Sequence, residues 1–281
     1  MEKVKTIWIL WYQGSNDMPT IVKECYKSWC EKNKDFEVVV LDKNNLEKYV
    51  KIDNNIIQNK HITIQALSDI IRVNLLNQQG GIWVDATCYC MKPINSWLSK
   101  YMENGFFAFS NPSRDRLISS WFIASEPNSK ITREFAKIVN NYWLENPKMV
   151  KINNLNLTKR FILKIYLVFT GHMNNSIETS YWFSTFISKI LKIYPYFWFH
   201  YLFYKLYTNN SECKLLWDNT IKFSADIPHK MQFFGLNNTI TPNLQKDIDA
   251  CIDPLYKLSL KIDYENEKKD SVINCILKRN L

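Results

Sequence analysis

Three charged side chains close together in the sequence could jointly bind an anionic substrate. Asp69 and Arg72 lie three residues apart, and Asp85 follows a Gly80-Gly81 pair. Residues three apart on a helix share a face, so Asp69 and Arg72 can brace each other. A guanidinium also offers paired donors that suit a phosphate group. The alternative, a surface ion pair and an ordinary turn residue, stays open on the residue types alone.

Two predicted elements must bring these side chains together. Residues 62–79 carry apolar residues at helical spacing, which predicts an amphipathic helix. The glycine pair ends this helix in the position of a left-handed cap. Residues 82–87 alternate, so Trp83, Asp85 and Thr87 share one face of a predicted strand. Asp85 therefore lies near a strand end, where α/β sheets bind their ligands.

The flanking sequence predicts the rest of a sheet. Apolar, β-branched runs at 4–12 and 36–42 predict buried strands, and helical patterns follow them at 19–33 and 44–50. This order predicts a parallel, doubly wound sheet. Further elements are expected as strands at 106–110 and 118–125 and a helix at 129–144.

An aromatic region with interspersed lysines follows at 161–207. Its two most apolar pieces are too short and too interrupted to span a bilayer. We expect both to be helices packed on the sheet domain, with solvated lysines. Interfacial contact with a membrane is the alternative.

Composition narrows the function class. The chain has 281 residues, 46% of them hydrophobic and 15% aromatic, which excludes a disordered protein. The formal net charge of +9 favours anionic partners, but no basic run is long enough to predict a nucleic-acid-binding arm. The opening segment reads as a strand rather than a signal peptide. The seven scattered cysteines are expected to be reduced thiols in a cytoplasmic protein, without a structural zinc.

Three segments carry a resemblance to a known family: LWYQG (10–14), SDIIR (68–72) and GGIWVDAT (80–87). The chain resembles the capsular-polysaccharide-synthesis glycosyltransferases. These are relatives of the DXD-containing, family 32-like sugar transferases and of the glucosyltransferase domains of clostridial toxins. The match is good over about the first 145 residues and looser beyond them.

The resemblance implies a GT-A fold, that is, an α/β architecture with a Rossmann-like, mostly parallel sheet flanked by helices. An aromatic-rich helical region is added in the C-terminal half. It also implies one domain over residues 1–281. Within it, we expect a nucleotide-sugar-binding core at 1–145, a helical acceptor-side region at 150–210, and a segment at 211–281 that completes the site.

The implied activity is transfer of a sugar from a UDP-sugar to a saccharide or lipid-linked saccharide, with retention of configuration, in bacterial capsular or surface polysaccharide synthesis. The protein would work in the cytoplasm or at the inner face of the plasma membrane. The alternative is a catalytically degenerate protein that binds saccharide or tethers a membrane assembly, which Thr87 in place of a second carboxylate favours.

By position, the resemblance assigns catalytic roles to three residues. Asp69 would hold hydroxyls of the donor sugar, Arg72 would contact the sugar or the phosphates, and Asp85 would take the first acidic position of the DXD motif. Trp11 would stack on the uracil, although plain core packing is its alternative. Further residues expected at the donor are Gln13, Gly14, Ala86 and Thr87.

A growing negative charge on the leaving diphosphate requires a cation. The resemblance implies Mn²⁺ or Mg²⁺ at Asp85 and Thr87. From the chemistry, we expect His229 as a distant ligand and Lys230 as a phosphate contact. Alternatively, His229 is a satisfied polar residue and basic side chains neutralise the charge. Since no carboxylate is positioned by sequence as a covalent nucleophile, front-face displacement is favoured.

Overall fold

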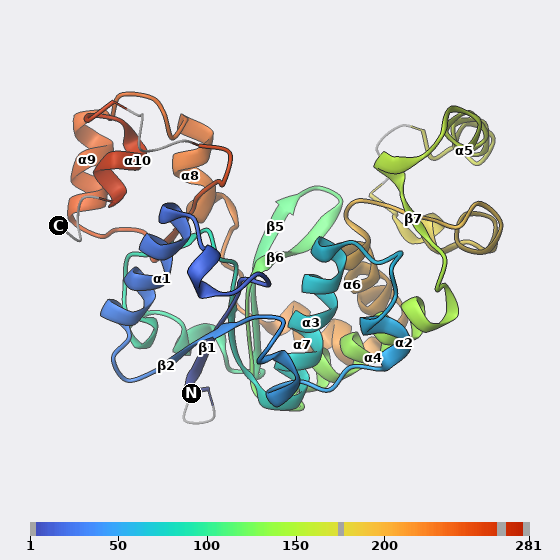
Figure 1. The fold of residues 1–281 in the computed structure, drawn as a ribbon, viewed down its shortest axis with the longest axis horizontal. Coiled ribbons are helices and arrows are strands. Elements are labelled where there is room, and N and C mark those ends of the chain that lie inside the picture. The colour runs from blue at the N-terminus through green and yellow to red at the C-terminus, as the bar shows by residue number, and fades with distance from the viewer. Residues whose placement is uncertain (1–3, 174–176, 263–267, 278–281) are drawn as a thin grey trace.

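The computed structural model describes residues 4–173, 177–262 and 268–277. A five-stranded sheet lies at its centre (Figure 1). The strands of this sheet are β1 (Thr6–Leu10), β2 (Glu37–Leu41), β3 (Gly81–Val84), β5 (Phe106–Ser113) and β6 (Arg116–Ser125). They are ordered β2-β1-β3-β6-β5.

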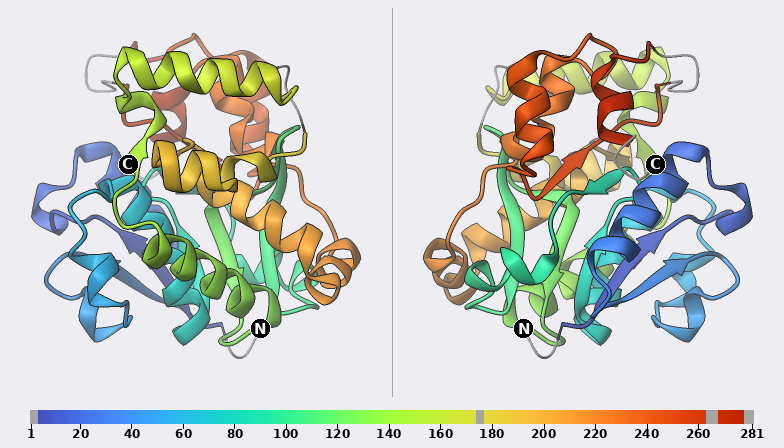
Figure 2. Two further views of the ribbon diagram at one scale, coloured as in Figure 1. Left: turned by 90° about the vertical axis from the view of Figure 1, so that its right-hand side faces the viewer. Right: turned by 90° about the vertical axis from the view of Figure 1, so that its left-hand side faces the viewer.

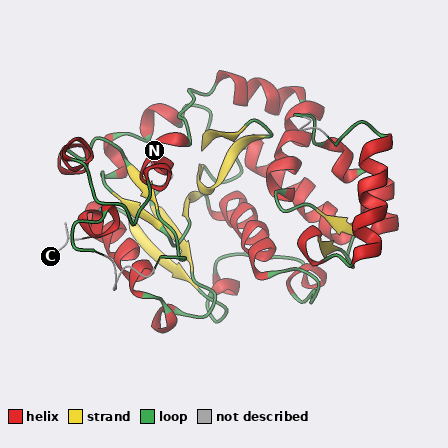
Figure 3. Cartoon of the chain, turned by 90° about the horizontal axis from the view of Figure 1, so that it is seen from above, coloured by secondary structure: helices red, strands yellow, loops and turns green. Residues whose placement is uncertain are grey.

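The sheet is parallel on one side and antiparallel on the other. β1 runs parallel to both β2 and β3, whereas β6 runs antiparallel to β3 and to β5. The parallel half is the part expected of a Rossmann-like arrangement. With helices on both sides of the sheet (Figure 3), the predicted α/β fold class is confirmed.

Ten α-helices are described within the ranges given above. They are α1 (Thr20–Lys32), α2 (Asn54–Ile57), α3 (Ile64–Gln79), α4 (Lys130–Glu145), α5 (Leu157–Phe169), α6 (Trp198–Asn209), α7 (Ser211–Asn219), α8 (Asp226–Phe234), α9 (Pro242–Asp249) and α10 (Val272–Leu277). None of the described helices is both long and apolar enough to cross a membrane. The helix expected at 44–50 is reduced to one 3-10 turn, Leu46–Lys48.

The alternation predicted for the strand after the glycine pair decides which layer each side chain enters. Trp83 packs with α3, α4 and α6 on one face of the sheet. Ile82 and Val84 face the other side, where Trp29 of α1 and Phe107 complete a second core. β3 ends at Val84, so Asp85 lies at the end of the sheet.

Short strands tie the later parts of the chain to this core. β4 (Cys88–Cys90) pairs antiparallel with β9 (Leu255–Lys257), so the C-terminal segment crosses directly behind the end of β3. β7 (Val150–Lys151) pairs parallel with β8 (Ile193–Tyr194) and anchors the helical region.

The two apolar pieces of the helical region behave differently. α6 packs on β6 and joins the main core, as expected. α5 does not, and the expectation that it packs on the sheet domain is wrong. Of its thirteen residues, Leu163 alone is buried, in a separate small cluster. α5 therefore stands apart from the sheet (Figures 1 and 2).

Candidate functional site

A cavity of about 670 Å³ opens at the end of β1 and β3. Its walls come from three parts of the chain. The sheet and α3 supply residues from 10–13, 63–72 and 83–87, β8 and α6 supply residues from 194–200, and α8 supplies residues from 229–233. The size lies within the range of small-molecule sites in proteins.

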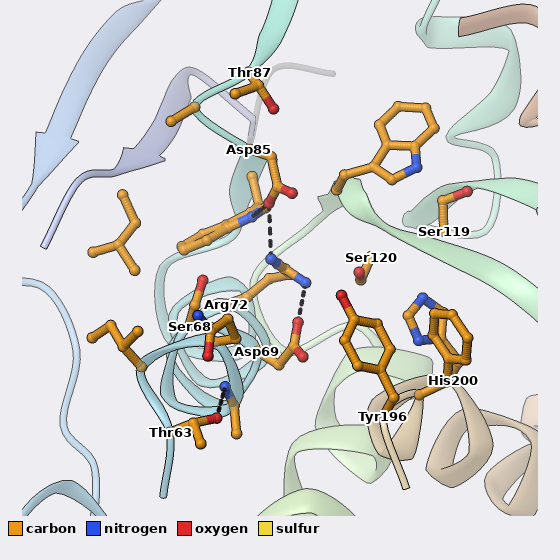
Figure 4. Close-up of a pocket in the computed structure, with 18 of the residues that line it drawn as sticks. Thr63, Ser68, Asp69, Arg72, Asp85, Thr87, Ser119, Ser120, Tyr196 and His200 are labelled. Carbon is orange, nitrogen blue, oxygen red and sulfur yellow. Dashed lines mark hydrogen bonds and ion pairs between the residues drawn. The ribbon is translucent and has the colours of Figure 1, made fainter. Parts of the chain in front are cut away.

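A buried guanidinium joins two carboxylates at the floor of this cavity (Figure 4). Arg72 Nη1 donates to Asp69 Oδ1, and Nη2 donates to Asp85 Oδ1 over 2.9 Å. The indole nitrogen of Trp83 also donates to Asp85 Oδ1, at 3.1 Å. The Arg72 side chain is 4% exposed and lies over the rings of Trp83 and Phe199. The three predicted catalytic residues therefore meet in one place.

The local sequence explains how α3 delivers these side chains. Thr63 caps the helix by accepting from the backbone N–H of Ala66. At the other end Gly80 and Gly81 have φ of 67° and 103°, and a Cβ on Gly81 would lie 2.7 Å from the carbonyl oxygen of Thr6. Only glycine permits this approach of helix end and sheet. The turn is therefore tight enough to bring β3 back alongside α3.

Burial and charge act in opposite directions on the two carboxylates. For Asp69, burial dominates and raises the pKa to about 6, although Arg72 opposes it. For Asp85, burial also raises the pKa, but Arg72 and then Lys257 outweigh it, so the pKa is lowered. Asp85 is thus the fixed anion of the pair, and Asp69 is the one that can take up a proton near neutrality.

Lys257 does not itself line the cavity, but it contacts two residues that do, and the sequence analysis missed it. Its ammonium donates to Thr87 Oγ1 and lies 3.9 Å from Asp85 Oδ2. β9 places it there, because Lys257 pairs with Cys88 in the two-stranded sheet. In sequence it stands 170 residues from Thr87, in a segment with no motif of its own.

Two buried polar atoms on the opposite wall have no hydrogen-bond partner within the described part of the chain. They are Nδ1 of His200 and Oγ of Ser119. Burial, followed by Arg116, lowers the pKa of His200 to about 3, so its imidazole is neutral. Both side chains line the cavity. Buried polar groups are normally satisfied, so these two atoms are exceptions to the usual pattern.

The other predicted donor residues divide into two groups. Trp11, Gln13, Ala86 and Thr87 line the cavity, and the Trp11 indole donates to the carbonyl of Asp17. Gly14 and Lys230 are not among the lining residues, although His229 is.

The ammonium of Lys230, predicted to contact a phosphate, is paired elsewhere. It donates to Asp247 and lies 3.6 Å from Asp253. Lys257 stands instead beside the end of β3, where the sequence analysis had expected a phosphate contact.

The metal ion implied by the resemblance would need several oxygen ligands. Within residues 4–173, 177–262 and 268–277, no three His, Cys, Asp or Glu side chains gather as a ligand group. The Lys257 ammonium occupies the space beside Asp85 and Thr87. Nδ1 of His229 is 2.9 Å from the carbonyl oxygen of Ala225. The side chains as they stand do not fit a metal ion. The assignment of Asp85, Thr87 and His229 as metal ligands stays a prediction.

One family model matches most of the chain. Residues 1–155 and 166–276 match the family model described as capsular polysaccharide synthesis protein. The chain is 25% identical over 160 residues to the O-glycosyltransferase braB of Annulohypoxylon truncatum, and the match covers 50% of this chain. The chain spans 38% of that relative's length. Among solved structures, it is similar to the PaToxG glycosyltransferase, with a TM-score of 0.37 and 17% identity over 68% of this chain and 79% of the other.

Proposed function

This chain belongs to the capsular polysaccharide synthesis protein family, and on that premise we propose that it is a glycosyltransferase. It moves a sugar from a UDP-sugar to a saccharide or lipid-linked saccharide acceptor in the synthesis of a bacterial surface polysaccharide. The configuration at the anomeric carbon is retained.

One observation carries the proposal. A single buried guanidinium, Arg72, holds two carboxylates from different elements at the floor of a cavity large enough for a nucleotide sugar. Asp69 and Asp85 each have one oxygen that Arg72 does not engage, and these two oxygens suit the hydroxyl groups of a sugar. A purely structural ion pair would not need a cavity above it.

The positive charge that stabilises the leaving diphosphate comes from a side chain of the protein. The ammonium of Lys257 meets the diphosphate at the end of β3, while Arg72 keeps the two carboxylates from repelling it. Charged donors fixed in a buried site stabilise developing anionic charge without reorganisation. The same arrangement accounts for a threonine at position 87, since its hydroxyl orients Lys257.

The proposed reaction uses no covalent nucleophile, because both carboxylates of the cavity are assigned to binding the sugar. Among the described residues that line the cavity, the carboxylates are Asp69 and Asp85, and Arg72 holds both. The bond between the anomeric carbon and the phosphate oxygen breaks first. An acceptor oxygen then bonds to that carbon from the same face, and its proton passes to the departing phosphate. No covalent sugar–enzyme intermediate is formed.

The wall with free polar atoms receives the hydroxyl groups of the reacting sugars. The neutral imidazole of His200 can accept a hydrogen bond through Nδ1, and the Ser119 hydroxyl can donate or accept. Arg116, on the same wall, lies 3.9 Å from the centroid of the Phe197 ring. These side chains orient the acceptor above the donor sugar.

The test is a donor screen of the intact chain. Calorimetry should detect UDP binding, and one UDP-sugar of a panel should be consumed by hydrolysis or by transfer to added saccharides. UDP binding without consumption of any donor would favour the degenerate saccharide-binding protein. A chain that ignores UDP and every UDP-sugar would contradict the proposal.

A further inference from the structure

The outward face of α5 is apolar and exposed. Leu157, Phe161, Ile165 and Val168 follow one another at intervals of four and three residues, which places them on one face of the helix. Leu157 is 84% exposed, Phe161 65% and Val168 55%; Phe169, at the end of the helix, is 85% exposed. Apolar side chains gathered on one helix face mark a surface that is covered in the working state of a protein.

The segment of sequence that contains α5 is basic. Residues 146–211 contain eight Lys or Arg and one acidic residue, Glu178. This stretch therefore carries most of the net charge of +9. On α5 itself, Arg160 and Lys164 lie along one border of the apolar face. A helix with an apolar face bordered by cations is the form that binds to the interface of an anionic membrane.

A second cavity lies against α5. It has a volume of about 540 Å³ and combines apolar side chains, such as Leu167 and Met173, with the cations Arg160 and Lys164. A phospholipid presents the matching chemistry, since a phosphate stands above hydrocarbon. An uncharged lipid surface would offer the Lys164 ammonium no anionic partner.

We propose that α5 is a membrane-docking helix, which lies in the interface of an anionic phospholipid bilayer with Phe161 and Phe169 inserted. The inference does not depend on sugar transfer, because it rests on the exposure and charge of α5. With thirteen residues, α5 lies along the surface and does not span it.

Docking in this way would bring the active cavity near the lipid. α5 and the helices α8–α10 stand beyond the same end of the central sheet, at the top of the views in Figures 1 and 2. Tyr196 and Phe233 line the cavity between them and are 56% and 70% exposed. A lipid-linked acceptor held in the bilayer could reach this apolar rim without leaving the membrane.

The experiment measures flotation of the full-length chain with vesicles, without sugar nucleotide. Vesicles of phosphatidylcholine and phosphatidylglycerol in equal parts should bind the protein, and added salt should weaken binding. The double variant Phe161→Ser, Phe169→Ser should bind on the order of a hundredfold more weakly. Lys164→Gln should lose roughly fivefold.

Leu215→Ser is the matched control, because Leu215 is 61% exposed but lies on α7. It should bind vesicles like the unchanged protein, and circular dichroism should show that all variants are folded. Equal binding to vesicles of pure phosphatidylcholine would contradict the proposal that the membrane must be anionic. The proposal would be overturned if the protein bound no vesicles and sedimentation showed a dimer that is lost in the double variant. The apolar face of α5 would then be an interface with a second copy of the chain.

Discussion

At the end of β3, charged side chains are buried, and at α5 apolar side chains are exposed; both arrangements are costly in isolation. The first is compensated inside the chain. Arg72 is 4% exposed, but it pairs with Asp69 and Asp85 and lies over two aromatic rings. The second has no such compensation among the described residues, since the apolar face of α5 points into solvent.

The difference shows where each region meets its ligand. Because the buried charges balance one another, the cavity is a preformed site that a small molecule can enter without rearrangement. α5 instead presents a surface whose partner must be extended. The two regions should therefore be separable by mutation, with sugar chemistry at one and surface binding at the other.

The largest effect is expected at the cavity. Asp85→Asn keeps the shape of the side chain but removes the charge that pairs with Arg72 and Lys257. Turnover of the UDP-sugar should fall by about a thousandfold, as when a charge-stabilising group is removed from an active site. The measurement is donor hydrolysis or transfer to a saccharide free in solution.

The α5 double variant, Phe161→Ser with Phe169→Ser, is the control for separability. It should keep its turnover with that saccharide, because neither phenylalanine lines the cavity. If it lost turnover as completely as Asp85→Asn, the two regions would not be independent.

A smaller effect is expected from Lys257→Met, which removes the ammonium beside Asp85 and leaves an apolar side chain of similar length. We expect turnover to fall by about a hundredfold and UDP to bind more weakly. Lys230→Met is the matched control, since the Lys230 ammonium pairs with Asp247 and Asp253 and not with Asp85 or Thr87.

Metal removal sharpens the same test. With Lys257 as the cation, a chelator should leave the activity of the unchanged protein within about twofold, since Lys257 already stands where an ion would neutralise the diphosphate. Activity lost on chelation and restored by Mn²⁺ would instead assign the charge to a metal ion.

The pH dependence isolates Asp69. Its pKa is raised to about 6 by burial, so its charge is lost as the pH falls through that value. Turnover should decline about tenfold per pH unit below about pH 6. A pH–rate profile that is flat down to about pH 4 would exclude Asp69 from the reaction.

The raised pKa of Asp69 also makes the stability of the fold depend on pH, but stability is lost as the pH rises, whereas turnover is lost as it falls. The folded carboxyl binds its proton more tightly than the unfolded one, whose pKa is 3.8. The free energy of unfolding, measured relative to Asp69→Asn, should therefore fall as the pH rises from about 4 to above 6.

How much the sequence could predict depends on the distance between the partners. Asp69 and Arg72 are joined by helix spacing, and Asp85 follows through one tight glycine turn, so local rules place all three. Lys257 reaches the same point only through the pairing of two three-residue strands, β4 and β9. Strands that short have no periodicity to predict, and their register depends on the whole tertiary fold.

The apolar periodicity of α5 can be read from the sequence, but whether the apolar face points into the core or into solvent cannot. A helical repeat of apolar residues indicates that one face is apolar without saying what covers it. α6 is also rich in apolar residues, and these do enter the core, because α6 lies against β6. The sequence therefore favoured core packing for both helices, and the structure separates them.

Unfolding compares a core phenylalanine with one on α5, and the smallest expected effect is the one at α5. Phe135 of α4 is 1% exposed and lies 4.6 Å, centroid to centroid, from the ring of Phe199. Phe135→Ala should lower the free energy of unfolding by about 3–5 kcal/mol, because it removes packed apolar surface and leaves a cavity. Phe161→Ala, the same change on the outer face of α5, should shift it by less than about 0.5 kcal/mol. Denaturant unfolding in the absence of lipid measures both. A loss above about 1 kcal/mol for Phe161→Ala would mean that this face is already packed in solution. A near-zero value means that Phe161 contributes nothing to the isolated fold, so its apolar surface is available to a partner outside the chain.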